Sequence, residues 1–247
     1  MANELDEVTG PTSAEGRDIN VITKQIPATV GVGSRVFEIA LWTVGTIPGL
    51  VMLMTGVVPP LNALGFAVAG ALPGLIFLFM KISALNYLQQ LQQRIQANAS
   101  QIDNYLEQRV VILQNLLGLV TKAIDLDKDV MKSVAAYRGG SGAVADSHRN
   151  QASAQIDGIF SRINVAFEAY PDLKAHASIA DAMRQNSYLQ KEITAARTLY
   201  NDTIAIWNQD IFAWPTKQIV AARAGYTTRI PFVTSAETKA AARGTFF

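Results

Sequence analysis

The longest apolar stretch of the chain is 39–80, where 42 consecutive positions between Glu38 and Lys81 carry no charged side chain. A bilayer core about 30 Å thick takes about 20 apolar residues of helix, so this stretch is too long for one span and long enough for two. Pro59 and Pro60 interrupt it, because proline lacks the amide donor that continues a helix. The pattern predicts a membrane hairpin over 35–81, with apolar segments at 36–58 and 61–80.

The two apolar segments share a short repeat. Gly45-Thr-Ile-Pro48-Gly49 resembles Gly70-Ala-Leu-Pro73-Gly74, 25 positions further on. One interpretation is that glycine and proline are simply common in membrane helices. The other is a closely packed hairpin with kinked helices, because a G-x-x-x-G spacing lets two helix backbones approach each other in lipid. On that interpretation the packing residues are Gly45, Pro48, Gly49, Gly70, Pro73 and Gly74.

The charges that flank the hairpin predict its orientation. Lys24 and Arg35 precede the uncharged stretch 39–80, Lys81 and Arg94 follow it, and the link at 59–60 is uncharged. Positively charged flanks remain on the cytoplasmic side of a membrane. Both ends of the hairpin, and the chain segments attached to them, are therefore expected in the cytoplasm.

After the hairpin, apolar residues recur every three or four positions, which indicates amphipathic helices. The pattern predicts a helical domain over 82–225, with helices at about 82–137, 150–170, 178–213 and 216–224. Such helices, joined by short turns, are typical of an antiparallel bundle. The predicted fold class is all-α, with an N-terminal transmembrane helical hairpin followed by a long-helix antiparallel three- or four-helix bundle.

The first helix of this domain is rich in glutamine. These uncharged side chains either form a solvated face or allow several copies to pack side by side without charge repulsion, and they are Gln89, Gln90, Gln92, Gln93, Gln96 and Gln101.

The two ends of the chain show weak apolar periodicity. Residues 1–34 contain five acidic side chains together with Gly, Pro, Ser and Thr, and they are predicted to form a flexible acidic arm. Residues 226–247 form a C-terminal tail that could dock on the bundle or on a neighbouring subunit.

Composition narrows the classes of function. The absence of cysteine excludes disulfides, thiolate metal sites and a cysteine nucleophile. A net charge of +1 gives no electrostatic reason to expect nucleic-acid binding. His148 and His176 lack the spacing of a metal site, and the Asp125-x-Asp127-x-Asp129 run lacks the glycine and closing glutamate of a calcium loop. The chain is therefore expected to have no catalytic site, metal or cofactor, and not to be an enzyme.

Several motifs resemble those of the LemA family. Phe167-Glu-Ala-Tyr-Pro-Asp-Leu-Lys-Ala175 resembles its E-A-Y-P-D-L-K-A turn, and the 193–202 stretch resembles its I-A-x-A-R-x-x-Y-N motif. Weaker likenesses occur around Arg109 and at 207–215. The positions that carry the resemblance, and which it implies to be structural, are Arg109, Asn115, Tyr170, Pro171, Asp172, Arg197, Tyr200, Asn201, Trp207 and Pro215. Of these, Arg197, Tyr200 and Asn201 share a helix face, where they either fix helix packing through hydrogen bonds or bind a partner.

The resemblance implies a membrane-anchored, mostly four-helix domain in the bacterial inner membrane. The chain departs from the family in its longer N-terminal arm, its hairpin, and Val111 and Gln114 in place of an acid and a proline. The family includes members linked to membrane invagination and members encoded beside membrane proteases.

The leading hypothesis is a scaffold that binds membrane lipids, forms a homo-oligomer and shapes or organises the membrane. The alternative is a membrane-tethered adaptor for a membrane protease or a signalling partner.

Overall fold

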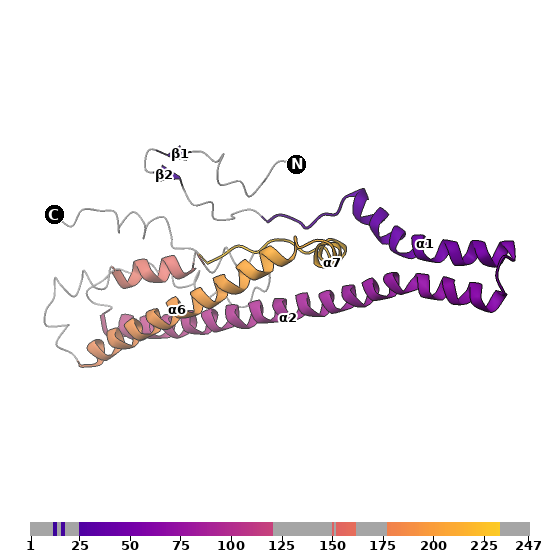
Figure 1. The fold of residues 1–247 in the computed structure, drawn as a ribbon. Coiled ribbons are helices and arrows are strands. Elements are labelled where there is room, and N and C mark those ends of the chain that lie inside the picture. Colours follow the sequence, from indigo (N-terminus) through magenta and orange to yellow (C-terminus); the bar gives the residue numbers. More distant parts are fainter. Residues whose placement is uncertain are drawn as a thin grey trace. The chain divides into compact units, whose positions relative to one another are not determined.

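The computed structural model describes residues 12–13, 16–17, 25–120, 150, 152–161 and 177–232. Its named elements, shown in Figure 1, are β1 (Thr12–Ser13), β2 (Gly16–Arg17), α1 (Val32–Thr55), α2 (Pro60–Val120), α6 (Ala177–Asp210) and α7 (Thr216–Ala224). Residues 152–161 form a further helical segment. The two-residue strands pair antiparallel, with Thr12 opposite Arg17. Apart from this ladder and one isolated bridge, the described chain has helices as its regular structure, which confirms the predicted all-α class.

The turn between α1 and α2 has a local cause. α1 ends at Thr55 because Gly56 adopts a left-handed conformation with φ 66°, which glycine reaches without a steric penalty. α2 begins at Pro60, a position where the missing N–H would have no helical partner in any case. The carbonyl of Pro59 accepts bonds from the amides of Asn62 and Ala63 at 2.9 and 3.1 Å. Pro48 and Pro73 lie inside α1 and α2, and both helices continue past them.

α1 and α2 are each long and apolar enough to cross a membrane. In their most apolar windows, only 6% of α1 and 17% of α2 is buried inside the protein. A core helix of a soluble protein would be covered by other parts of the chain, and these two segments are not. Their composition and exposure are therefore compatible with membrane association.

α2 continues from the second apolar segment into the helical domain without interruption. From Ala84 to Leu106 its buried positions are spaced by three or four residues, as in Leu88, Leu91 and Ile95. This is the stripe that an amphipathic helix presents to neighbouring helices. The predicted helix over 82–137 is thus the second part of α2 as far as residue 120, and 121–137 lies outside the described residues.

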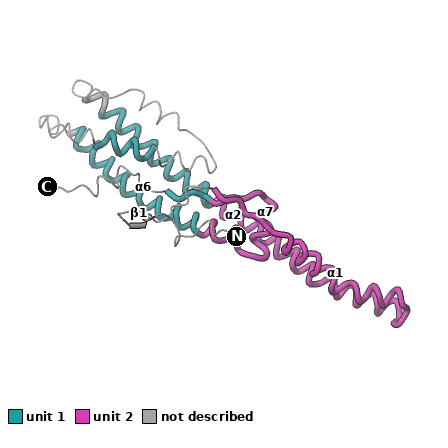
Figure 2. Tube along the Cα trace, turned by 90° about the horizontal axis from the view of Figure 1, so that it is seen from above, with its two compact units in different colours: residues 1–24, 94–205, 229–247 teal, residues 25–93, 206–228 magenta. Residues whose placement is uncertain are grey.

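The chain divides into two compact units, coloured separately in Figure 2. Unit 1 comprises residues 1–24, 94–205 and 229–247, and unit 2 comprises residues 25–93 and 206–228. The core of unit 1 is formed by buried side chains of three helical segments, among them Ile95, Ile102, Leu113, Ile156, Phe160, Ile193 and Tyr200. That of unit 2 includes Leu88, Leu91, Trp207, Ile211, Ile219 and Ala221.

The last residues of the predicted arm over 1–34 form hydrogen bonds with the chain after α7. The amide of Ala28 donates to the carbonyl of Tyr226, and the amide of Thr228 donates to the carbonyl of Ile26, each at 2.9 Å. The Ile26 amide also donates to the Thr228 hydroxyl at 2.8 Å. Backbone groups about 200 positions apart in the sequence thus form hydrogen bonds with each other. A periodic pattern within one segment cannot predict such pairing. The start of the predicted 226–247 tail is likewise paired, whereas 233–247 lies outside the described residues.

Candidate functional site

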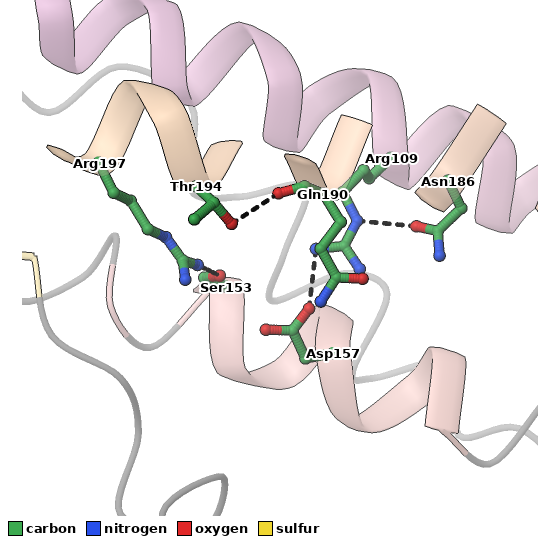
Figure 3. A network of polar contacts seen from close by, with 7 residues as sticks. All are labelled: Arg109, Ser153, Asp157, Asn186, Gln190, Thr194 and Arg197. Carbon is green, nitrogen blue, oxygen red and sulfur yellow. Dashed lines mark hydrogen bonds and ion pairs between the residues drawn. The ribbon is translucent and has the colours of Figure 1, made fainter. Parts of the chain in front are cut away.

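The most connected polar cluster of unit 1 surrounds Arg109 of α2 (Figure 3). Arg109 is only 1% exposed, so its charge requires partners. Its Nε donates to Oδ1 of Asn186 in α6, and its Nη1 donates to Oδ1 of Asp157, each at 2.8 Å. Its guanidinium carbon lies 5.0 Å from the ring centroid of Phe160. Arg109 therefore connects three helical segments through one side chain.

A second arginine of unit 1, Arg197 of α6, contacts the same short helix. Its Nη2 donates to the hydroxyl of Ser153, and its guanidinium carbon lies 4.3 Å from the ring centroid of Phe232. Its Nε is buried and has no hydrogen-bond partner among the described residues. Burial lowers the pKa of Arg197, the carboxylate of Asp157 opposes that shift, and the charge of Arg109 adds to it. The carboxylate of Asp157 is thus paired with Arg109 and also acts electrostatically on Arg197.

Asn201, one turn beyond Arg197, holds the polypeptide backbone at Phe232. Its amide nitrogen donates to the Phe232 carbonyl at 2.9 Å, and its amide oxygen accepts the Phe232 amide at 2.6 Å. Tyr200 beside it is 1% exposed. The face formed by Arg197, Tyr200 and Asn201 therefore contacts the 152–161 helix and the chain after α7.

The remaining motif positions are distributed over the fold. Trp207 in unit 2 is 2% exposed, and its indole nitrogen donates to the carbonyl of Thr227 at 2.9 Å. Pro215 occupies the N-cap of α7, and Asn115 is exposed on α2. Tyr170, Pro171 and Asp172 lie outside the described residues, as do Asp125, Asp127, Asp129 and both histidines.

The glycines of the hairpin repeat lie at close contacts between α1 and α2. A methyl group added to Gly70 would lie 1.8 Å from the carbonyl oxygen of Gly45, and one added to Gly45 would lie 2.1 Å from that of Gly70. At Gly49 it would lie 2.3 Å from the backbone of Ala67, and at Gly74 2.5 Å from the ring of Trp42. These positions leave no space for a larger residue as the helices are packed.

The open end of the hairpin carries a second polar cluster, in unit 2. Glu38 of α1 lies 3.5 Å from Lys81 of α2 and also pairs with Arg223 of α7. Directly beside it, the Phe37 ring packs against Phe77 and against Trp214, with centroids 5.5 and 5.2 Å apart. One carboxylate therefore links three helices at the edge of the uncharged stretch.

Several members of these clusters were not identified from the sequence. Asn186 stands within the apolar stripe of α6, and a lone polar residue in such a stripe is a usable signal of a buried hydrogen bond. Ser153 and Asp157 are four residues apart on one helix, which gives no comparable signal. Arg223 and Phe232 are recognised only from contacts with distant parts of the chain.

Among the described residues, no group of three or more His, Cys, Asp or Glu side chains could hold a metal ion. The arginine clusters contain hydrogen-bond donors, acceptors and aromatic rings in mutual contact. This arrangement fixes neighbouring helices and terminal segments to one another.

The fold and these contacts define a class, that of helical-bundle proteins with two apolar helices capable of crossing a membrane. The model of the LemA family matches residues 98–246. This match spans more than half of the chain, which therefore belongs to the LemA family, as its motifs predicted. The matched range extends through the tail, beyond the 82–225 domain predicted from the sequence.

The chain is also similar to Protein LemA of Metamycoplasma hominis. The two are 25% identical over 143 residues, which is 57% of this chain and 65% of that protein. The matched part thus spans slightly less than two thirds of this relative.

Proposed function

We propose that this protein is a non-catalytic membrane scaffold, which forms a homo-oligomer at the bacterial inner membrane and shapes or organises that membrane. The observation that carries the proposal is the continuity of α2. Its first part is apolar and largely uncovered by the protein, and its second part belongs to the helical domain. The apolar segment and the first helix of the domain therefore belong to one helix.

The hairpin supports a role in shaping the membrane. Its glycine contacts bring α1 and α2 to backbone contact over Gly45, Gly49 and Gly70, so the pair occupies a small, defined cross-section. Outward side chains such as Val44 and Phe79 are each 72% exposed and would face lipid. Many identical hairpins inserted side by side would then occupy a defined area of the bilayer.

The glutamine-rich face of α2 supports assembly from several copies. Gln89, Gln90 and Gln93 are exposed in unit 2, and they carry no charge that would oppose contact between identical helices. In this proposal the cationic flanks Arg35 and Lys81 place the domain on the cytoplasmic side.

A pair of charge variants tests the assembly. Gln89→Glu with Gln93→Glu places two like charges, one helical turn apart, on the proposed contact face. Gln190→Glu with Thr194→Glu makes a matched change at two exposed positions of α6 with the same spacing. We expect the wild type and the α6 control to form large symmetric particles after mild extraction, and the α2 variant to give smaller ones. Wild-type particles of one or two copies would contradict the scaffold.

The adaptor remains a second candidate because one surface groove of unit 1 exposes apolar side chains. The groove, of about 540 Å³, lies between α2 and α6. Its members Val111 and Tyr188 are 49% and 61% exposed. An adaptor would carry a foreign polypeptide in a fixed ratio after mild extraction, and Tyr188→Ser would remove it while leaving the particle otherwise unchanged.

A further inference from the structure

A cleft of about 420 Å³ lies within unit 2, between the chain that enters α1 and the helix α7. Its charged and hydroxyl lining includes Ser34, Arg35, Glu38 and Arg223, and the rest of its wall comes from residues 28–30, Ile219 and Ala222. The pairing of Ile26–Ala28 with Tyr226–Thr228 holds the two sides together. The cleft is therefore bounded by segments from opposite ends of the chain.

The cleft carries more positive than negative charge. Glu38 is its acidic side chain, and this carboxylate already pairs with Arg223 and lies 3.5 Å from Lys81. Arg35 is exposed and forms no ion pair with any other described residue. Arg223 remains 57% exposed beside Glu38, so part of its guanidinium faces solvent. Two arginines and one carboxylate thus line the cleft, and this excess of positive charge attracts an anion.

The backbone adds to this attraction. α1 begins at the cleft, its N-cap residue Gly31 has no side chain that could cap the first amides, and its first turn holds no acidic residue. The amides of a first helical turn point outward and favour a negative group beside them. Ser34 in this turn supplies a hydroxyl to the same space.

The position of the cleft along the hairpin indicates where its ligand comes from. Glu38 and Lys81 bound the 42 uncharged positions, so they mark the level at which the hydrocarbon region would end. Trp214 contacts Phe37 at this level and is 58% exposed, and tryptophan favours the headgroup region of a bilayer. Arg35 and Arg223 then lie at the depth of lipid phosphates.

We propose that this cleft binds the phosphate of an anionic phospholipid headgroup, with Arg35 and Arg223 as charged donors. Guanidinium groups suit this ligand because two parallel N–H groups match two phosphate oxygens. The inference depends on the proposed insertion of the hairpin in a membrane, because a lipid reaches the cleft only from there.

The test uses the full chain in phosphatidylcholine nanodiscs with and without phosphatidylglycerol, followed by mild detergent release and native mass spectrometry of retained lipid. Arg35→Gln is the main variant because this side chain forms no ion pair with another residue of the described segments. Arg223→Gln is the second variant, and Arg184→Gln, at an 82% exposed arginine outside the cleft, is the control. We expect phosphatidylglycerol retention to fall about tenfold or more in both cleft variants and to stay unchanged in the control.

Equal retention by the wild type and Arg35→Gln would overturn the proposal. Displacement of the lipid by inorganic phosphate at equal concentration would show that the cleft binds free phosphate. That result would overturn the proposal that its ligand is a lipid. Particle mass is read from the same samples. Unchanged lipid retention in Arg35→Gln with an intact assembly overturns only the cleft, whereas failure of the wild type to enter nanodiscs overturns the membrane scaffold as well.

Discussion

The side chain of Asn201 binds both backbone groups of Phe232, donating to its carbonyl at 2.9 Å and accepting its amide at 2.6 Å. An asparagine amide combines an NH2 donor group with an acceptor oxygen, and here it pairs with a backbone segment as a neighbouring strand would. The chain after α7 is held to α6 by this pair and by the contact of Arg197 with the Phe232 ring. The motif face of α6 therefore holds a segment that follows it by about 30 residues.

Replacing Asn201 by alanine should destabilise unit 1 by about 2 kcal/mol, because two hydrogen bonds are lost and the Phe232 backbone groups are left without partners. Chemical denaturation followed by circular dichroism would measure the change. Asn115→Ala is the matched control, since Asn115 belongs to the same motif set but is exposed on α2, and its replacement should alter stability by less than about 0.5 kcal/mol. Equal effects of the two changes would refute the role assigned to Asn201.

Replacing Arg109 by methionine should cost about 3 kcal/mol or more. The change keeps much of the side-chain length but leaves Asn186, which is 5% exposed, without its donor. Asp157 is 29% exposed and can regain water, so Asp157→Asn should cost less than Arg109→Met. Arg184→Met, at an exposed arginine of α6, should be nearly neutral. A neutral result for Arg109→Met in denaturant titration would contradict the network.

Replacing Gly70 by alanine should lower the thermal stability of the hairpin in detergent, because the added methyl group would lie 1.8 Å from the Gly45 carbonyl oxygen. Overpacking of this kind costs about 1–3 kcal/mol. Gly65→Ala is the control on the same helix, since a methyl group there meets nothing within 4 Å. Both changes raise helix propensity by about 1 kcal/mol, so their difference isolates the packing cost. If both variants melted at the same temperature, the close contact would be excluded.

The charge of Glu192 raises the pKa of Tyr188 above its ordinary value of 10.0, and a hydrogen bond to the same carboxylate adds to the shift. Glu192→Gln should therefore lower the pKa of Tyr188 towards 10.0. The difference in tyrosinate absorbance between wild type and Tyr188→Phe isolates this group, and the same difference measured on the Glu192→Gln background shows the shift. Because the folded state holds this proton more tightly than the unfolded state, the stabilisation is complete below pH 10.0 and is lost as pH rises through the raised pKa. An unchanged titration would exclude Glu192 as the cause.

The sequence was most informative where structure depends on neighbours along the chain. The apolar run between Glu38 and Lys81, the prolines at 59–60 and the three- and four-residue periodicity indicated the helices and the turn between them. A continuous helix from Pro60 to Val120 follows from such local rules, because its hydrogen bonds join residues four positions apart. The motifs around Arg197 led to the LemA family, since residue type and spacing can be compared without a structure.

The partners of the charged side chains came only from the tertiary structure. Glu38 meets Arg223 across 185 positions, and Ile26 meets Thr228 across 202. The sequence showed that Glu38 stands at the edge of an apolar stretch, but many distant arginines could have paired with it equally well. Such pairing is decided by how helices pack and which buried donors need acceptors. That is why the sequence alone determined the helices and the family, while the arginine network, the order at residues 25–31 and the cleft beside Arg35 were decided by the fold.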